Sequence, residues 1–257
     1  MDPILEIKNV SLQFGGVKAL EDVSYHINKG EIFSLIGPNG AGKTSMLNCI
    51  SGLYQPTGGS ILYKGHEIIN MKPYNRTALG IARAFQNIAL FAHMSVLDNL
   101  KLGRHTLMNS GPISGGMYVG KAAKEEIAHR QKVEEVIEFL ELQDIRHTPV
   151  GTLPYGLQKR VEVGRALALN PDLILLDEPM AGMNKAEKDE MSHFIVEMHE
   201  TMNMTVVLIE HDLGVVMNLS EHIAVLDFGR VIGFGTPAEI QENPAVIKAY
   251  IGEEAVI

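Results

Sequence analysis

The chain contains a single cysteine, Cys49, and therefore cannot form a disulfide within itself. This scarcity favours a reducing compartment, in which Cys49 would serve as a small buried hydrophobic residue. The sequence also lacks a run of about eighteen apolar residues, the length that a membrane-spanning helix needs. Residues 1–6 show no basic segment followed by an apolar one, as a secretion signal would. We therefore expect a protein that is neither secreted nor membrane-spanning, and whose role at a membrane, if it has one, runs through a partner.

The chain also has fewer basic than acidic residues. The chain has 22 Lys and Arg against 31 Asp and Glu, which gives a formal net charge of −9. Proteins that bind nucleic acid neutralise phosphates with clustered Lys and Arg, so nucleic acid is not an expected partner. Apolar material is abundant by contrast, because 46% of the 257 residues are hydrophobic. This is enough for the core of one large or two small globular domains.

Residues 37–44 constrain the chemistry more tightly than any other stretch. They form a complete phosphate-binding motif, which reads Gly37, Pro38, Asn39, Gly40, Ala41, Gly42, Lys43 and Thr44. The glycines let backbone N–H groups close around phosphate oxygens, Lys43 can reach the outer phosphates, and the Thr44 hydroxyl can bind Mg²⁺. The apolar run 32–36 and the residues from Ser45 onward predict the strand and helix that flank such a loop. The sequence therefore predicts a nucleoside triphosphate site, and the lack of internal repeats predicts one such unit per chain.

The first two thirds of the chain change in pattern from strands to helices. Alternating residues within 1–30 predict antiparallel strands, and a second β segment follows the phosphate loop. Strand signals then vanish from about residue 94 to 165. Within that part, apolar residues recur at the spacing of a helix face, namely Val133, Val136, Ile137 and Leu140. Residues 109–116 are rich in turn formers and are predicted to be an insertion.

Two continuous apolar runs, 173–176 and 206–209, are typical of strands buried on both faces of a parallel sheet. A helix with an apolar core stripe is predicted between them, through Met191, Phe194, Ile195 and Met198. We therefore predict an α/β fold with a mainly parallel sheet, an N-terminal antiparallel β subdomain and an inserted helical subdomain. The predicted boundaries are a single domain over 1–257, with a nucleotide-binding core over 1–93 and 166–257 and a helical subdomain over 94–165.

Two carboxylates, Asp177 and Glu178, follow the first of these runs directly. The carboxyl ends of parallel strands are where open α/β sheets bind their ligands. One carboxylate could hold Mg²⁺ through water while its neighbour orients or activates a water against the γ-phosphate. An acidic pair at a strand end can also be only a solvated terminus. The phosphate-binding motif upstream favours the catalytic interpretation.

Several segments together, in their order and rough spacing, resemble those of ATP-binding cassette (ABC) proteins. They are the phosphate loop, Gln86 within 84–87, the segment 153–160, Asp177 to Pro179, the turn 181–184, and His211. The resemblance covers nearly the whole chain. It extends to the larger ATPase subunit of branched-chain amino acid importers, through residues 14–16, 80–86, the insertion after Leu100, 209–212 and the ending 243–250.

The resemblance implies roles for individual residues. Phe14 would stack on adenine, with Ala19 packing nearby. Gln86 would sense the γ-phosphate and Mg²⁺, Glu178 would polarise the attacking water, and His211 would contact the γ-phosphate. It further implies that Ser45 joins the phosphate loop in binding the nucleotide. The implied metal ligands are Thr44, Gln86 and Asp177.

The chain departs from the family pattern in two places, and the first is the signature, whose Ser hydroxyl and backbone amides meet the γ-phosphate of a partner chain's nucleotide. The family's signature commonly reads Leu-Ser-Gly-Gly-Gln, whereas this chain has Pro154 in place of the serine. Proline supplies neither a hydroxyl nor an N–H. Tyr155, Gly156 and the start of a helix predicted over 158–169 still offer backbone amides, so we expect a working but altered contact. Asn184 stands where the family turn usually has Asp, which keeps an acceptor and removes a charge.

By resemblance, the chain is expected to be the ATP-hydrolysing subunit on the cytoplasmic face of an importer in the inner membrane. ATP and Mg²⁺ would be its cofactors. Its partners would be a second ABC ATPase subunit, identical or different, transmembrane permease subunits and, indirectly, a substrate-binding protein. The transported solute would be a branched-chain or related hydrophobic amino acid.

Other functions remain open at this point. The solute could be urea, a short amide or an aromatic acid. A soluble ABC-type ATPase acting on nucleic acid or ribosomes would predict two cassettes, a long coiled coil or a basic surface, and none is visible. A P-loop kinase or GTPase would explain the phosphate loop alone. A GTPase would also need an Asn-Lys-x-Asp run, which is not found.

Overall fold

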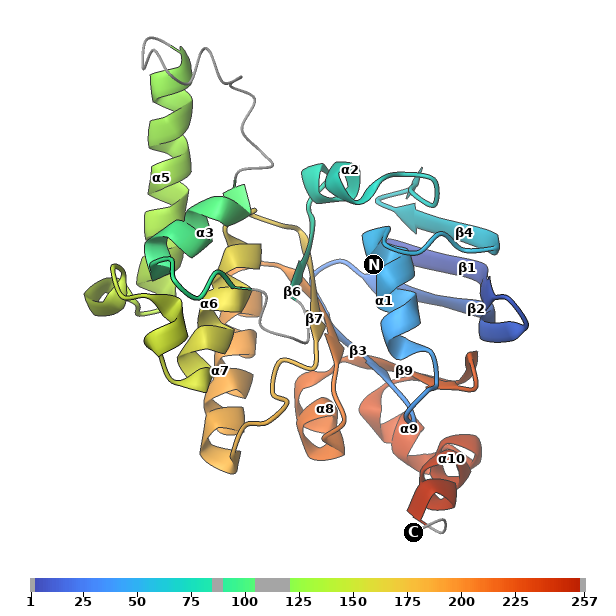
Figure 1. Cartoon of the computed structure of the whole chain (residues 1–257). Coiled ribbons are helices and arrows are strands. Elements are labelled where there is room, and N and C mark those ends of the chain that lie inside the picture. Colours follow the sequence, from blue (N-terminus) through green and yellow to red (C-terminus); the bar gives the residue numbers. More distant parts are fainter. Residues whose placement is uncertain (1–2, 85–89, 105–120, 255–257) are drawn as a thin grey trace. The chain divides into compact units, whose positions relative to one another are not determined.

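A computed structural model describes residues 3–84, 90–104 and 121–254. The chain divides into two compact units. One, called the core unit here, comprises Met1–Gln86 and Asp172–Ile257, and the other, the helical unit, comprises Asn87–Pro171. The helical subdomain predicted over 94–165 lies inside the second unit. Both units are drawn in Figure 1.

An N-terminal antiparallel sheet opens the core unit. Its order is β2-β1-β4-β5. The strands are β1 (Pro3–Phe14), β2 (Val17–Asn28), β4 (Gly58–Tyr63) and β5 (His66–Glu67). Alternation of apolar and polar residues turns one face of β1 and β2 to the core, with Leu5, Ile7, Val23 and Ile27 almost fully buried. The antiparallel strands predicted within residues 1–30 are thus confirmed.

A six-stranded central sheet forms the rest of the framework, in the order β10-β9-β3-β8-β7-β6. The strands are β3 (Ile32–Ile36), β6 (Ile81–Ala84), β7 (Leu173–Asp177), β8 (Thr205–Ile209), β9 (His222–Asp227) and β10 (Arg230–Gly235). All neighbours are parallel except β10, which pairs antiparallel with β9. Every residue of β3, β7 and β8 is buried. For β7 and β8 this is the burial that the apolar runs 173–176 and 206–209 predict.

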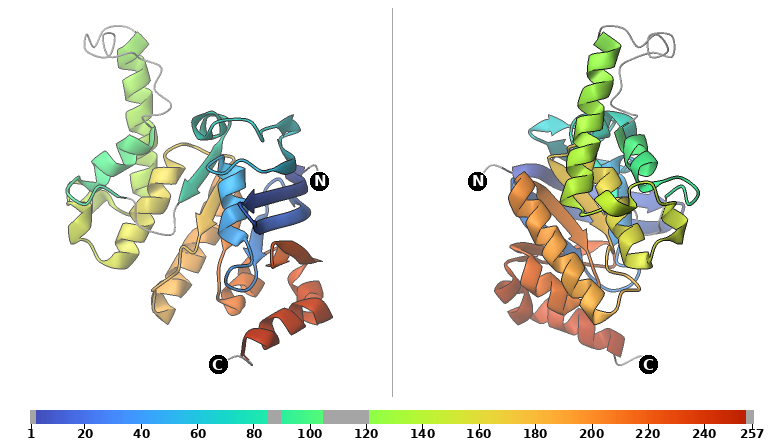
Figure 2. Two further views of the ribbon diagram at one scale, coloured as in Figure 1. Left: turned by 45° about the vertical axis from the view of Figure 1, so that its right-hand side comes forward. Right: turned by 90° about the vertical axis from the view of Figure 1, so that its left-hand side faces the viewer.

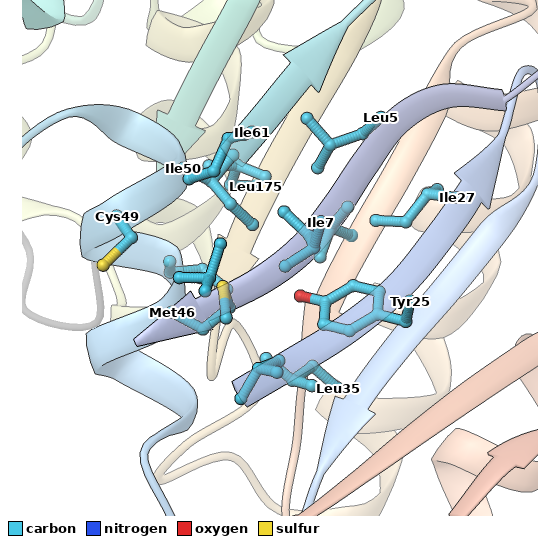
Figure 3. Packing of buried hydrophobic residues seen from close by; sticks show 14 of the residues in the cluster. Leu5, Ile7, Tyr25, Ile27, Leu35, Met46, Cys49, Ile50, Ile61 and Leu175 are labelled. Atoms are coloured by element: carbon cyan, nitrogen blue, oxygen red, sulfur yellow. The ribbon is translucent and has the colours of Figure 1, made fainter. Parts of the chain in front are cut away.

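Helices cover both faces of the central sheet. They are α1 (Lys43–Ser51), α2 (Pro73–Ala78), α7 (Lys185–Met202), α8 (Leu213–Leu219), α9 (Pro237–Glu242) and α10 (Pro244–Glu254). Helix α1 lies between the two sheets, where Met46 and Ile50 pack with Ile7, Leu35 and Leu175 in the main core (Figure 3). On the opposite face a smaller hydrophobic cluster forms beneath α8, α9 and α10. Figure 2 shows the ribbon of the chain from two further sides.

Two predictions about side chains in the core unit can be compared with the packing. The predicted stripe of Met191, Phe194, Ile195 and Met198 is the buried face of α7. Cys49 is fully buried in α1, and burial raises the pKa of its thiol to about 12, so it acts as a packing residue.

The helical unit contains α3 (Val96–Arg104), α5 (Lys121–Phe139) and α6 (Tyr155–Leu167), with short 3₁₀ turns at Gln143–Ile145 and Val150–Thr152. The three helices pack on one another. Helix α6 approaches its neighbours closely at Gly164, where an added Cβ would lie 2.3 Å from a Leu140 methyl carbon. Helix α6 begins three residues before the predicted start at 158, because Pro154 is its N-cap and fixes a backbone dihedral compatible with helix entry.

No helix in the described parts of the chain is both long enough and apolar enough to cross a membrane.

Candidate nucleotide-binding site

The loop between β3 and α1 has the backbone that the phosphate-binding motif predicts. Gly37, Gly40 and Gly42 all have positive φ angles, of 145°, 79° and 104°. The Lys43 ammonium group folds back over the loop, where Nζ donates to the carbonyl oxygens of Gly37 at 2.7 Å and Pro38 at 2.8 Å. The charge of Lys43 therefore lies at the mouth of the loop, although the residue is only 6% exposed. Thr44, at the start of α1, is exposed.

Neighbouring backbone closes in on the loop from behind. A Cβ on Gly37 would lie 2.0 Å from the carbonyl oxygen of Leu226, and one on Gly42 would lie 2.6 Å from that of Ala19. The N–H of Gly229, in the turn between β9 and β10, donates to the carbonyl of Ala41 at 3.0 Å. At Gly40, by contrast, an added Cβ would meet nothing within 4 Å. The loop is thus walled on one side and open on the other.

Substitution of Gly37 by Ala should destabilise the chain by roughly 2–4 kcal/mol, since overpacking against backbone adds to the strain of a positive φ. Differential scanning calorimetry should show a drop in Tm of roughly 5–10 °C. Gly40→Ala is the matched control, because it meets the same kind of φ strain in open space. Equal losses of stability in the two variants would contradict the crowding described here.

Asp177, the last residue of β7, is 2% exposed and paired with a buried arginine. Its Oδ2 accepts from Arg83 Nη2 at 2.7 Å. Its other oxygen, Oδ1, is buried and has no hydrogen-bond partner among the described residues. Buried polar atoms are nearly always paired, so an orphaned carboxylate oxygen beside the phosphate-loop helix suits a metal-bound water.

Glu178 follows in a left-handed conformation, with a φ angle of 50°. Such a φ angle is uncommon for a residue with a side chain, and strained backbone of this kind is concentrated at functional sites. The Glu178 N–H donates to the carbonyl of Ile209 at the end of β8. Its Oε1 lies 2.5 Å from Nε2 of His211, so the two residues meet across the carboxyl ends of adjacent strands. His211 is the more exposed of the two side chains, at 45% against 14%.

A third carboxylate, Glu210, connects the loops that carry these residues. It is 5% exposed and accepts hydrogen bonds from the N–H groups of Met180 at 2.8 Å and His211 at 3.3 Å. Burial raises the pKa of the Glu210 carboxyl above its usual value, and the two N–H groups oppose this shift. Glu210 therefore fixes the backbone of the loop after β7 to that of the loop after β8. Sequence reasoning gave it no role.

The predicted adenine platform, Phe14, ends β1 and is 48% exposed. Its ring packs edge to face with Tyr54, with centroids 5.1 Å apart at 76°. Ala19 is partly buried against the main core. An exposed aromatic face is available for stacking, and Tyr54, which the sequence analysis did not single out, restrains it from one side.

These residues fit a bound nucleotide and magnesium. The loop offers glycine backbone that a Cβ would crowd, a lysine cation at its mouth and the hydroxyl of Thr44. The orphaned Oδ1 of Asp177 is a hard oxygen atom, which suits Mg²⁺ either directly or through a bound water.

Two family models match the chain. A model described as ABC transporter matches residues 20–181, and one described as branched-chain amino acid ATP-binding cassette transporter matches 230–256. The chain belongs to the ABC transporter family. The resemblance stated from the sequence is thereby confirmed.

Individual relatives agree with this membership. The high-affinity branched-chain amino acid transport ATP-binding protein BraF of Pseudomonas aeruginosa is 38% identical over 98% of this chain and 98% of its own. The crystal structure of the ADP conformation of an ABC transporter cassette matches with a TM-score of 0.85 and 33% identity, over 98% of this chain and 100% of that one. A dimeric bacterial ABC transporter cassette matches with a TM-score of 0.75 and 26% identity, over 91% and 98%. The predicted fold class is confirmed, and the protein is an ABC-type ATPase.

The ABC signature segment lies in the helical unit. Tyr155 and Gly156 are the first two residues of α6, and the N-cap Pro154 makes no side-chain hydrogen bond to the helix. The first N–H groups of a helix have no partner within it and carry a partial positive charge. Tyr155 and Gly156 therefore stand at a helix N-terminus, the position from which the sequence predicts contact with a partner's nucleotide. Gln86 lies outside the described residues.

The ABC turn at 181–184 explains one departure. Asn184 is the N-cap of α7 and accepts from the N–H of Glu187, whose side chain in turn accepts from the N–H of Asn184. Asn caps a helix about as well as Asp, so the replacement preserves the local fold.

Proposed function

We propose that this chain binds and hydrolyses ATP to energise a membrane permease that imports branched-chain amino acids. The observation that carries the proposal is the hydrogen bond between Glu178 and His211 at the carboxyl ends of β7 and β8. A carboxylate oriented in this way can accept a proton from a water, and a histidine beside it can hold the carboxylate and contact a phosphate. Glu178 and His211 would thus be catalytic residues, and Gln86 joins them by the family resemblance alone.

The phosphate groups would be bound by the backbone of the loop 37–42, by Lys43 and by Ser45. Phe14 would carry the adenine, with Ala19 beside it. Thr44, Gln86 and Asp177 would hold magnesium, which supplies charge neutralisation on the phosphate oxygens when it is bound. Each of these roles uses a group that fits the chemistry of its ligand.

A second cassette would complete the site. The segment with Tyr155 and Gly156, at the start of α6, would donate amides to a nucleotide on another chain, and support comes from a solved ABC cassette of similar fold that is dimeric. Binding of ATP between two cassettes would draw them together, and hydrolysis would release them. The cassettes would lie at the cytoplasmic face of the inner membrane, where ATP is available, and their cycle would drive the permease. A substrate-binding protein would deliver the solute.

The solute is inferred from likeness to BraF and from the match of residues 230–256 to a branched-chain amino acid transporter model. Urea, amides and aromatic acids are the alternatives that an experiment must separate.

A reconstituted complex tests the whole proposal. The chain should be co-expressed with the permease and ATPase genes that neighbour its own and placed in proteoliposomes with the cognate binding protein. We expect ATP hydrolysis to rise several-fold with leucine, isoleucine or valine and to stay at the basal rate with urea, acetamide or phenylalanine. Stimulation by one of the latter group alone would replace the substrate assignment. Failure to associate with any membrane protein would overturn the transport role.

A further inference from the structure

Arg83 is a charged residue in the middle of a buried strand. It lies on β6 opposite Leu175 of β7, and its side chain is 7% exposed. An arginine is rarely buried unless its donors are paired. Burial removes the guanidinium from water, so hydrogen bonds within the protein must compensate the lost hydration.

Those partners belong to two elements of the nucleotide site. Nη2 donates to Asp177 Oδ2 at 2.7 Å, at the end of β7. Nη1 donates to Asn48 Oδ1 at 2.6 Å and to Ser51 Oγ at 3.2 Å, both on α1. Helix α1 begins at Lys43 and carries Thr44. One planar guanidinium thus connects the carboxylate of Asp177 to the helix that carries the other described metal ligand.

The arrangement divides the two oxygens of Asp177 between different tasks. Oδ2 is held by Arg83, whereas Oδ1 is buried without a partner. A carboxylate anchored through one oxygen cannot rotate freely, so the second oxygen is fixed in direction. The cation also compensates a buried negative charge, which would otherwise be costly.

Arg76 shows what a purely structural buried arginine looks like in the same unit. It is 1% exposed, and its guanidinium donates to the backbone carbonyls of Met71, Cys49, Ile50 and Ile69. Those contacts close the end of α1 and include no side chain of the site. Arg83 differs because its Nη1 and Nη2 donate to side chains, one of them the carboxylate of Asp177.

We propose that Arg83 is a positioning residue for the magnesium site, which holds Asp177 by Oδ2, leaves Oδ1 to the metal and sets the spacing between Asp177 and α1. This inference rests on the proposed function, because it takes Asp177 as a ligand of Mg²⁺. Arg83 itself would touch neither metal nor nucleotide. Its loss should therefore affect magnesium dependence more than nucleotide binding.

The test compares Arg83→Met and Arg83→Lys with Arg76→Met in the full chain. A fluorescent ATP analogue is titrated in EDTA and then with increasing Mg²⁺, and ATP hydrolysis is followed over the same Mg²⁺ range. For Arg83→Met we expect the half-saturating Mg²⁺ concentration to rise at least tenfold, with analogue affinity in EDTA changed less than twofold. Arg83→Lys should fall between Arg83→Met and the parent chain. Arg76→Met should lower Tm and leave the Mg²⁺ dependence unchanged.

An unchanged Mg²⁺ dependence in Arg83→Met, with only a lower Tm, would reduce Arg83 to a structural role like that of Arg76. If Arg83→Met fails to fold, Arg83→Lys and Asn48→Ala decide the question: a rise of at least threefold supports the proposal, and no rise overturns it. Should the parent chain itself bind no ATP or hydrolyse it without Mg²⁺, the proposed function fails. If instead the parent chain binds and hydrolyses ATP with Mg²⁺ and the Arg83 variants are unaffected, only the role proposed for Arg83 fails.

Discussion

Replacement of Glu178 by Gln should lower the rate of ATP hydrolysis by about 10²–10⁴-fold, the range associated with loss of a general base. Glutamine keeps the size of the side chain and can still hydrogen-bond to Nε2 of His211, so the fold and the left-handed backbone should persist. It cannot draw a proton from water. ATP affinity should therefore remain within a few-fold of the parent value.

The measurement is single-turnover hydrolysis together with equilibrium ATP binding, and size-exclusion chromatography with ATP and Mg²⁺ should show an enriched dimer. Glu197→Gln, an exposed glutamate on α7, removes the same charge away from the site and serves as the control. A Glu178→Gln variant with the parental rate would remove Glu178 from the catalytic set.

Replacement of Lys43 by Met should weaken ATP binding by roughly 10- to 150-fold, which corresponds to about 1.5–3 kcal/mol for a charge-assisted hydrogen bond. The ammonium group is held at the loop by the carbonyls of Gly37 and Pro38, so the cation lies where phosphate is expected. Methionine fills similar space without donors or charge. The loop should keep its shape while losing its attraction for the outer phosphates.

Isothermal titration calorimetry with ATP, ADP and adenosine gives the decisive pattern. The loss should be larger for ATP than for ADP and absent for adenosine, because only the phosphates feel the missing charge. Lys29→Met, at an exposed position in the turn before β3, controls for the overall change in charge. An equal loss for all three ligands would indicate a collapsed loop instead.

The sequence predicted well those parts of the fold in which a residue type strongly favours a single local structure. Continuous apolar runs became β7 and β8, and the glycines at 37, 40 and 42 took the positive φ angles that their loop requires. The start of α6 was placed too late, because a proline at an N-cap is compatible with a helix that begins directly after it.

The support of the site was harder to foresee. Arg83 and Glu210 are charged residues that act through contacts to distant segments, at Asp177 and at Met180, and no local pattern announces such partners. The available signal was the placement of a charge within or directly after an apolar run, which is costly unless the charge is paired. Tyr54 gave no signal at all, since its contact with Phe14 depends on how a loop returns to the tip of β1.

The wall behind the phosphate loop bears on how this chain should be compared with its relatives. Leu226, whose carbonyl crowds Gly37, and Gly229, whose N–H binds Ala41, lie between the two stretches that match family models, 20–181 and 230–256. The backbone that packs against the phosphate loop from behind therefore lies outside both matched stretches. A substitution at Gly229, in the turn between β9 and β10, would then reshape the phosphate loop through its contact with Ala41, from a position outside both matched stretches.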